Sequence, residues 1–137
     1  MPIHEQEEAF VRHFIVAYKQ ERYLHFLSKP KTRGKFLSEL YHRLAIKGAL
    51  AAELPPVKRT VIEVQQRLQI LGAETIAYVI SPYDRLDQKW LPLTDVLTDI
   101  LSTGTEAILC CITGQLAFVQ TEDSAYILND QPQKLSS

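Results

Sequence analysis

The spacing of apolar residues near the start of the chain predicts a helix. Between residues 3 and 27 there is neither proline nor glycine. Apolar side chains recur there three, four and seven positions apart, which is typical of a helix with one apolar face: Phe10, Phe14, Ala17, Leu24 and Leu27. We predict one long amphipathic helix over 3–27. Its apolar stripe is wider than one contact face, so we also predict self-association through it.

Proline and glycine divide the next part of the chain. Pro30 cannot continue the first helix, so we expect a second helix to start there, capped by Ser28 or Thr32, and to end near Gly48. These two helices should form a helical hairpin. The Pro55-Pro56 pair favours an extended hinge, and a third helix is predicted from Thr60 to Leu71.

The apolar pattern changes after Gly72. Continuous runs rich in β-branched and aromatic residues predict strands over 75–81, 106–112, 115–120 and 125–128. The segment 82–90 reads as a loop, and 93–101 as a short crossover helix that ends at Gly104.

These elements predict an α+β fold. The helical hairpin and the third helix should pack on one face of a small four-stranded mixed sheet that has one crossover helix. The helix between the strands at 75 and 106 favours parallel pairing of those two strands. We expect residues 1–129 to form a single domain and residues 130–137 a flexible C-terminal tail.

Composition is that of an ordinary globular protein, with 46% hydrophobic residues among 137. No apolar run approaches the roughly 18 residues of a membrane span, and the acidic start "MPIHEQEEAF" does not resemble a secretory signal. We therefore expect a cytoplasmic protein without a membrane partner.

Cys110 and Cys111 are the two cysteines. Adjacent residues of a strand point to opposite faces, so a disulfide between them would distort the strand. We expect two buried thiols that react slowly with thiol reagents.

Charge is distributed unevenly along the chain. Residues 1–67 contain 12 Lys and Arg against 7 Asp and Glu, and residues 68–137 contain 3 against 9. The densest cationic stretch is "SKPKTRGKF", which holds Lys29, Lys31, Arg33 and Lys35. Clustered cations bind nucleic acid phosphates, but they are also common in solvated connections. On composition alone we favour the solvated connection and keep nucleic-acid binding as the alternative.

The histidines extend that alternative. His25 and His42 lie on opposite arms of the predicted hairpin, so it could bring them together. Two imidazoles beside a cation can cleave RNA by acid–base catalysis. Two unrelated surface or packing histidines are the simpler interpretation, and we favour it.

No motif predicts a metal or a cofactor. The carboxylates of 84–99 lack the dense oxygen ligands of a calcium loop, and the five glycines form no phosphate-binding loop. We predict neither a metal site nor a cofactor.

The proline-bounded loop "PYDRLDQKWLP" carries Tyr83, Arg85 and Trp90. Tyr, Arg and Trp are the residue types enriched in interaction hot spots, so we mark these three as candidates for partner binding. A tryptophan in such a loop can also fold back onto the core, and this second interpretation is the simpler one.

These observations favour a small binding or regulatory module over an enzyme, because no segment groups a nucleophile, a base and an oxyanion donor. We expect a homodimer, with a further protein partner open. The alternative is a nucleic-acid-binding or ribonuclease-type protein that uses residues 29–35 with His25 and His42.

Overall fold

The computed structural model describes residues 3–41 and 43–131. They include five α-helices and two 3₁₀ turns, η1 (Gly48–Leu50) and η2 (Pro56–Lys58). The helices are α1 (Glu5–Phe14), α2 (Ala17–Leu27), α3 (Pro30–Glu39), α4 (Val61–Ile70) and α5 (Leu93–Thr103). Among the described helices, none has the length and apolar character that crossing a membrane requires.

Six strands form one sheet in the order β1-β6-β5-β4-β2-β3, and every neighbouring pair is antiparallel. The strands are β1 (Ala51–Glu53), β2 (Ile76–Ile80), β3 (Lys89–Pro92), β4 (Ala107–Ile112), β5 (Leu116–Gln120) and β6 (Ala125–Asn129). The predicted α+β class is therefore confirmed, and the sheet is larger than the one we predicted.

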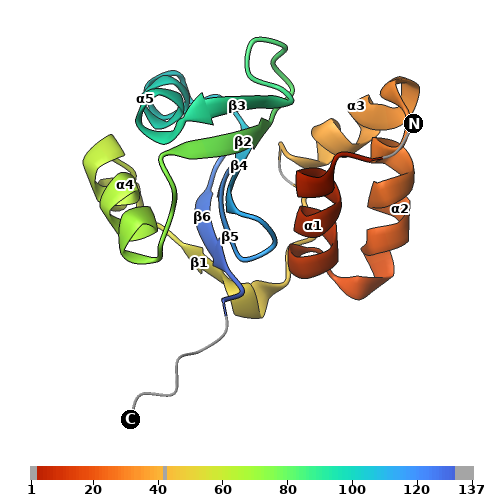
Figure 1. Cartoon of the computed structure of the whole chain (residues 1–137), viewed down its shortest axis with the longest axis horizontal. Helices are drawn as coiled ribbons and strands as arrows, with labels where there is room; N and C mark the ends of the chain where they lie inside the picture. The colour runs from red at the N-terminus through yellow and green to blue at the C-terminus, as the bar shows by residue number, and fades with distance from the viewer. Residues whose placement is uncertain (1–2, 42, 132–137) are drawn as a thin grey trace.

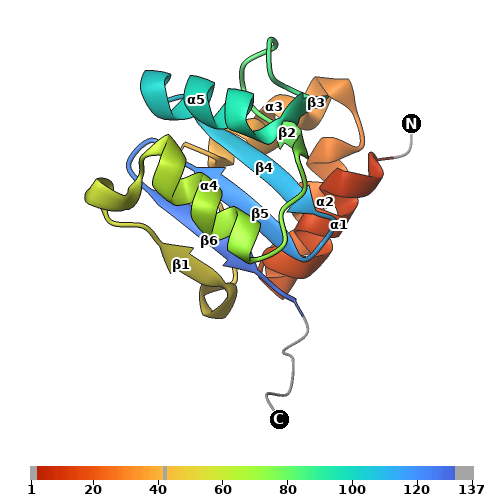
Figure 2. The same ribbon diagram turned by 60° about the vertical axis from the view of Figure 1, so that its left-hand side comes forward.

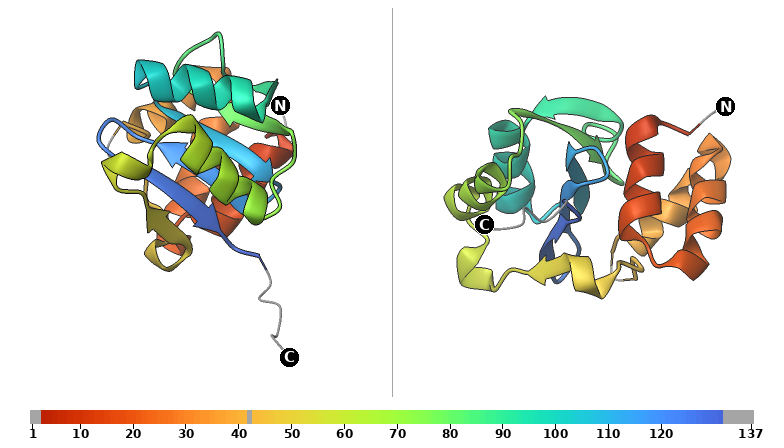
Figure 3. Two further views of the ribbon diagram at one scale, coloured as in Figure 1. Left: turned by 90° about the vertical axis from the view of Figure 1, so that its left-hand side faces the viewer. Right: turned by 60° about the horizontal axis from the view of Figure 1, so that its bottom comes forward.

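Helices cover both faces of the sheet. Figure 1 shows α1, α2 and α3 on one side of the strands and α4 and α5 on the other, and the right-hand view of Figure 3 shows the same three layers. Each face has its own core: Phe10, Phe14 and Phe36 pack on one side, and Val64, Leu68 and Leu97 on the other. Our prediction that the helices lie on one face was wrong. The unbroken apolar runs of β4 and β5 are typical of strands buried on both faces.

The predicted long helix over 3–27 is two helices. Ile15 and Val16 are extended and separate α1 from α2. Val16 donates its N–H to the Ala45 carbonyl at 2.9 Å, and Lys47 donates to the Phe14 carbonyl at 2.7 Å. Two adjacent β-branched residues tolerate this extended geometry well, and the bonds to a distant segment stabilise it.

The second predicted helix starts where we expected but is shorter and differently capped. Lys29, rather than Ser28 or Thr32, is the N-cap of α3, and Pro30 occupies the first turn. α3 ends at Glu39, well before Gly48, because the chain must leave the helix to place Ile46 beside Ile15. The α2–α3 hairpin itself is confirmed, as are the helices α4, with Thr60 as its cap, and α5, which ends at Gly104.

The predicted sheet lacked two strands. Ala51–Glu53 lies in the segment read as a hinge, and Lys89–Pro92 in the loop and its exit. β3 also explains why the predicted parallel pairing of β2 with β4 was wrong. The crossover helix α5 starts from β3, so it joins β3 to β4, and β2 lies between them antiparallel to both.

Both cysteines are buried free thiols in β4. Cys110 belongs to the core under α1–α3, and Cys111 to the core under α4 and α5, so they do point to opposite faces as predicted. Residues 132–137 of the predicted tail lie outside the described residues.

Candidate functional site

Arg33 lies in a buried ionic cluster where α1, α3 and the β2–β3 loop meet. Its side chain donates two hydrogen bonds to the carboxylate of Glu7, at 2.7 and 2.9 Å, and two more to the carboxylate of Asp87, at 2.9 and 2.8 Å. Arg33 is 9% exposed and Glu7 only 1%. Two bidentate pairs of this kind are the geometry that a planar guanidinium makes best.

Each member of this cluster is held by its own element. Glu7 lies in the first turn of α1, on the face that packs against the sheet. Asp87 lies in the β2–β3 loop, and its Oδ1 also accepts the N–H of Ser81 at 3.0 Å. Burial alone would lower the pKa of Arg33, but the hydrogen bonds and charges of the two carboxylates outweigh it and raise that pKa. Arg33 therefore remains a cation.

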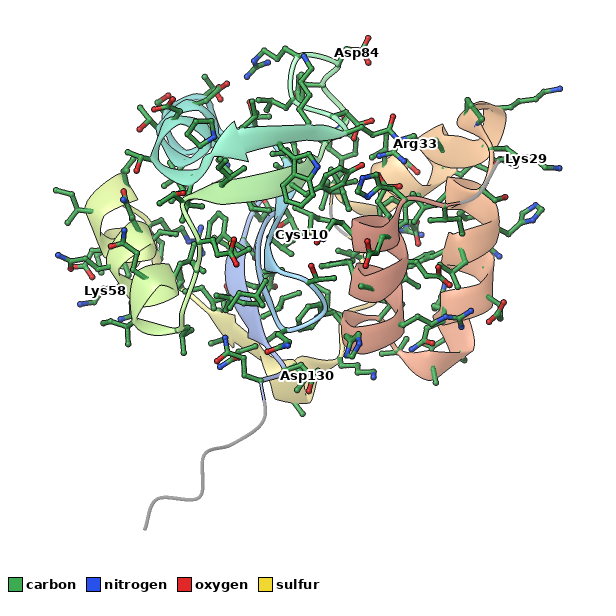
Figure 4. The ribbon with its side chains drawn as sticks, viewed as in Figure 1. Lys29, Arg33, Lys58, Asp84, Cys110 and Asp130 are labelled. Carbon is green, nitrogen blue, oxygen red and sulfur yellow. The ribbon has the colours of Figure 1, made fainter. Side chains whose placement is uncertain are left out.

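The four cations marked in the sequence are separated by this arrangement. Arg33 faces inward, whereas Lys29, Lys31 and Lys35 are exposed on α3 and its N-cap. Figure 4 shows Lys29 pointing away from the molecule and Arg33 lying on the inner side of α3. "SKPKTRGKF" is thus mainly a helix that is fastened through its central arginine, rather than a uniformly solvated connection.

An aromatic ring on α2 contacts one of these lysines. The ammonium of Lys35 lies 5.8 Å from the ring centre of Phe26, and the guanidinium of Arg22 lies 5.2 Å from it. Such cation–π contacts order both cations over one exposed face of the α2–α3 hairpin.

The histidine pair of the alternative function is not established. His25 is exposed on α2, and its ring lies 6.4 Å from that of Phe26. His42 lies outside the described residues. The acid–base mechanism therefore stays a prediction without geometric support.

Three aromatic rings extend the ionic cluster to the surface. The hydroxyl of Tyr78, on β2, donates to Glu7 Oε2 at 2.8 Å. Burial, and then this hydrogen bond, raise the pKa of Tyr78, so its phenol remains protonated. His4 stacks on Tyr78 with ring centres 4.2 Å apart, and Trp90 meets Tyr78 edge-on at 5.4 Å.

Trp90 is the exposed end of this arrangement. It pairs directly with Tyr78 across the β2–β3 ladder, which fixes its position on the sheet. Even so, 53% of its surface is exposed. The sequence analysis favoured a Trp90 that folds back onto the core. The structure shows that Trp90 does not do so.

Tyr83 and Arg85 lie on the β2–β3 loop and are both exposed. The guanidinium of Arg85 lies 5.5 Å from the ring centre of Tyr83 and donates to Asp99 Oδ1 at 2.8 Å. Tyr83 N–H is near the Ser81 hydroxyl at 3.3 Å, and the Tyr83 carbonyl accepts from Leu86 at 2.9 Å. The loop is thus internally hydrogen-bonded and anchored by Asp87.

Sequence reasoning missed His4, Glu7, Tyr78 and Asp87. A signal existed for Glu7, because it lies three, four and seven positions before Phe10, Val11 and Phe14 and so falls on the apolar face of its helix. A carboxylate on such a face requires a buried cation. The identity of that cation depends on tertiary structure.

Arg33 donates its hydrogen bonds to Glu7 and Asp87. These two carboxylates in turn accept hydrogen bonds from the Tyr78 hydroxyl and from the Ser81 N–H of the β2–β3 loop. Over the ranges 3–41 and 43–131, no group of three or more His, Cys, Asp or Glu side chains is placed to hold a metal ion. The exposed groups are aromatic and cationic, as in protein contact surfaces.

Comparison with known proteins adds no functional information: the chain matches no protein-family model, no curated protein and no solved structure.

Proposed function

We propose that this protein is a protein-binding module and that it contacts its partner through the surface formed by Trp90, Tyr83 and Arg85. The observation that carries the proposal is the exposure of Trp90 on a rigid base. Its indole is 53% exposed, while the Tyr78 ring beneath it is hydrogen-bonded to a buried, ion-paired carboxylate.

A rigid, exposed tryptophan suits a binding role on energetic grounds. Partner binding must offset the entropy of ordering side chains, about 0.5–1.5 kcal/mol for each flexible one. An indole that is already fixed by its neighbours avoids most of this cost and still offers a large apolar area. Tryptophan, tyrosine and arginine are the residue types that dominate interface hot spots.

The sheet edge beside Trp90 supports the same role. β3 is the last strand in the sheet order, so no strand within the described residues pairs with its outer side. Unpaired N–H and C=O groups along such an edge accept a partner's backbone. The partner surface would be an apolar one that covers the indole and reaches this edge.

The proposal includes self-association, but through a different surface from the one we predicted from the sequence. We expected it to use the apolar face of the first helix, but Phe10, Val11 and Phe14 pack against the sheet. We now place the self-contact, like the contact with any other protein, on the Trp90 surface.

The test is site-specific photo-crosslinking. The photoreactive amino acid p-benzoylphenylalanine replaces Tyr83, and the full chain is irradiated in the source-cell extract and in pure form at micromolar concentration. The proposal predicts a discrete crosslinked protein, identified by mass spectrometry as a partner or as a second copy of this chain. Adding Trp90→Ala should reduce the crosslinked yield at least tenfold.

Tyr18 supplies the matched control, because it is an exposed aromatic residue, 82% exposed, on α2. Tyr18→Ala should leave the crosslink unchanged. Equal loss in both variants, or a crosslink that is insensitive to Trp90→Ala, would contradict the proposal.

A second candidate function, nucleic-acid binding, is favoured by one observation: Lys29 and Lys31 are exposed and have no carboxylate within ion-pair distance among the described residues. The test is fluorescence anisotropy with a mixed single-stranded RNA at about 50 mM salt. Tight binding that weakens with salt, and that the Lys29→Gln, Lys31→Gln, Lys35→Gln variant loses, would support it. No binding at that salt concentration would remove it.

A further inference from the structure

A small cavity adjoins Trp90 where the first turn of α1 meets the sheet. Its volume is about 200 Å³. In Figure 2, α1 lies on the far side of the sheet from α4, with its N-terminal end toward β2 and β3. The residues that form the accessible wall of the cavity come from α1, from β2 and the residues before it, from β3 and from the β4–β5 turn: Gln6, Glu74, Ile76, Trp90, Thr113 and Gln115.

The charge on the wall of this cavity is negative. Of the described residues that line it, only Glu74 carries a charge, because burial raises the pKa of the thiols of Cys110 and Cys111 and keeps them protonated. Glu74 is exposed, and its carboxylate has no hydrogen-bond or ion-pair partner in the described part of the chain. A cationic group would complement it.

The nearest cation in the sequence of β3 does not supply that group. Lys89 precedes Trp90, so its side chain points to the opposite face of the strand. Its register partner Val79 belongs to the core under α4 and α5, whereas the partner of Trp90, Tyr78, belongs to the core under α1–α3. The Lys89 ammonium donates to the Arg85 carbonyl at 2.9 Å.

The wall also offers a fixed hydrogen-bond acceptor. Gln6 is only 8% exposed, and its Nε2 donates to Thr113 Oγ1 at 2.6 Å, which holds the amide in place. The Gln6 amide oxygen accepts no hydrogen bond from the residues that the structure describes. Together with the two oxygens of Glu74, it provides several acceptors for a ligand that carries several N–H donors.

The remaining wall is apolar and aromatic. Ile76 lies two residues before Tyr78 on β2, so it shares a sheet face with Tyr78 and with Trp90. Both Ile76 and Trp90 are about half exposed, at 48% and 53%. The face of an indole attracts a cation that lies within about 6 Å of the ring centre.

We propose that this cavity binds an arginine side chain of the partner protein, with the guanidinium between the Trp90 indole and the Glu74 carboxylate. The inference rests on the function proposed above and names the residue that the partner presents. A guanidinium is planar, stacks on aromatic rings and donates to carboxylates in pairs, so it uses both walls at once. The compact ammonium of lysine cannot stack in this way.

The test is a titration of the pure full chain with Nα-acetylarginine amide, followed by the emission of Trp90, the single tryptophan. We expect a saturable change in emission whose midpoint rises with salt concentration, because the contact is charged and exposed. Nα-acetylcitrulline amide has nearly the same shape without the charge. It should bind about tenfold more weakly.

Glu74→Gln removes the charge from the wall and should weaken binding of the arginine derivative about tenfold. Glu8→Gln is the matched control, because Glu8 is exposed on α1 and does not line the cavity. It should bind as the wild type does. Three outcomes would overturn the inference: no saturable change in emission, equal affinity for the arginine and citrulline derivatives, and equal affinity of Glu74→Gln and wild type.

The photo-crosslink from position 83 separates this inference from the proposed function. Glu74→Gln should reduce the crosslinked yield, as Trp90→Ala does, and the crosslinked segment of the partner should contain arginine. A crosslink that needs Trp90 but is unchanged by Glu74→Gln would overturn the arginine site and leave the proposed function standing. A crosslink that depends on neither residue would contradict the proposed function, and the titration, which needs no partner, would still decide whether the cavity binds arginine.

Discussion

At the scale of single residues, the guanidinium of Arg33 joins two helices to a loop. It holds Glu7 of α1 and Asp87 of the β2–β3 loop at once, so it fastens the helical layer to the sheet. Removing it would leave two buried carboxylates without a cation, and breaking a buried pair in this way costs about 3–5 kcal/mol.

We therefore predict that Arg33→Met lowers the free energy of unfolding by about 3–5 kcal/mol. Lys31→Met, in the same helix but exposed, should change it by less than about 0.5 kcal/mol. Urea unfolding followed by circular dichroism measures both. Equal stability of the two variants would show that the ionic cluster does not fasten the layers.

The two thiols make stability depend on pH in the alkaline range. Burial raises the pKa of Cys111 from its ordinary value of 9.0 to about 12, and burial raises that of Cys110 as well. Above pH 9 the unfolded chain therefore releases thiol protons that the folded chain retains. Since the folded state then binds more protons, its stability must fall as pH rises.

We predict a steady loss of unfolding free energy between pH 9 and pH 10, approaching about 1.4 kcal/mol per pH unit for each thiol. The Cys110→Ala, Cys111→Ala variant should lose the thiol part of this slope and keep only the smaller part that begins near pH 10, where Tyr23 and Tyr78, whose pKa values are also raised by burial, start to contribute. Urea unfolding at pH 8, 9 and 10 gives both slopes. A wild type whose stability is constant to pH 10 would contradict the burial of the thiols.

Residue roles were only partly predictable from the sequence. The burial of both cysteines followed from an apolar strand pattern, which is local. The inward position of Arg33 could not be predicted from a local pattern. Its neighbours in the sequence are three exposed lysines, and its partners are 26 and 54 residues away. Trp90 was marked as a candidate for partner binding from its residue type, and that role stays a prediction. Its exposure could not be predicted from the sequence, because it depends on the pairing of β3 with β2.

At the scale of elements, two glycines should respond in opposite ways to substitution by alanine, because one lies inside a helix and the other in a tight turn. Gly34 lies inside α3, and a Cβ there would meet no atom within 4 Å. Gly114 lies in the β4–β5 turn with φ +67°, and a Cβ there would lie 2.7 Å from the His13 ring.

We predict that Gly34→Ala stabilises the protein by about 0.5–1 kcal/mol, since alanine loses less backbone entropy in a helix. Gly114→Ala should destabilise it by about 1 kcal/mol or more, because it combines a left-handed backbone with a steric contact. Thermal unfolding of the two variants beside the wild type measures both signs. Destabilisation by Gly34→Ala would contradict the assignment of α3.

Elements with a strong local pattern were predicted well. α4, α5 and the strands β2, β4, β5 and β6 follow their apolar periodicity, and Thr60 and Gly104 mark ends that the sequence shows. β1 and β3 were missed because they have three and four residues and are mostly exposed, so neither shows a strand period. The break at Ile15 was missed because it depends on bonds to residues 45–47.

At the scale of the whole molecule, helices cover both faces of one sheet, and no strand within the described residues pairs with the outer side of β1 or β3. The α+β class was predictable from the order of helices and strands. The three-layer arrangement was not, because periodicity shows that a helix has an apolar face but not which face of the sheet it covers. The sheet order places β3, which carries Trp90, at one edge and β1 at the other.

The proposed function depends on Trp90 being both exposed and rigid, and the fluorescence of this residue tests that claim most directly. Trp90 is the single tryptophan of the chain, so its emission reports on the site without labelling. We predict efficient quenching by acrylamide together with an anisotropy decay that follows the tumbling of the whole molecule. Slow quenching, or depolarisation by fast local motion of the indole, would contradict the account.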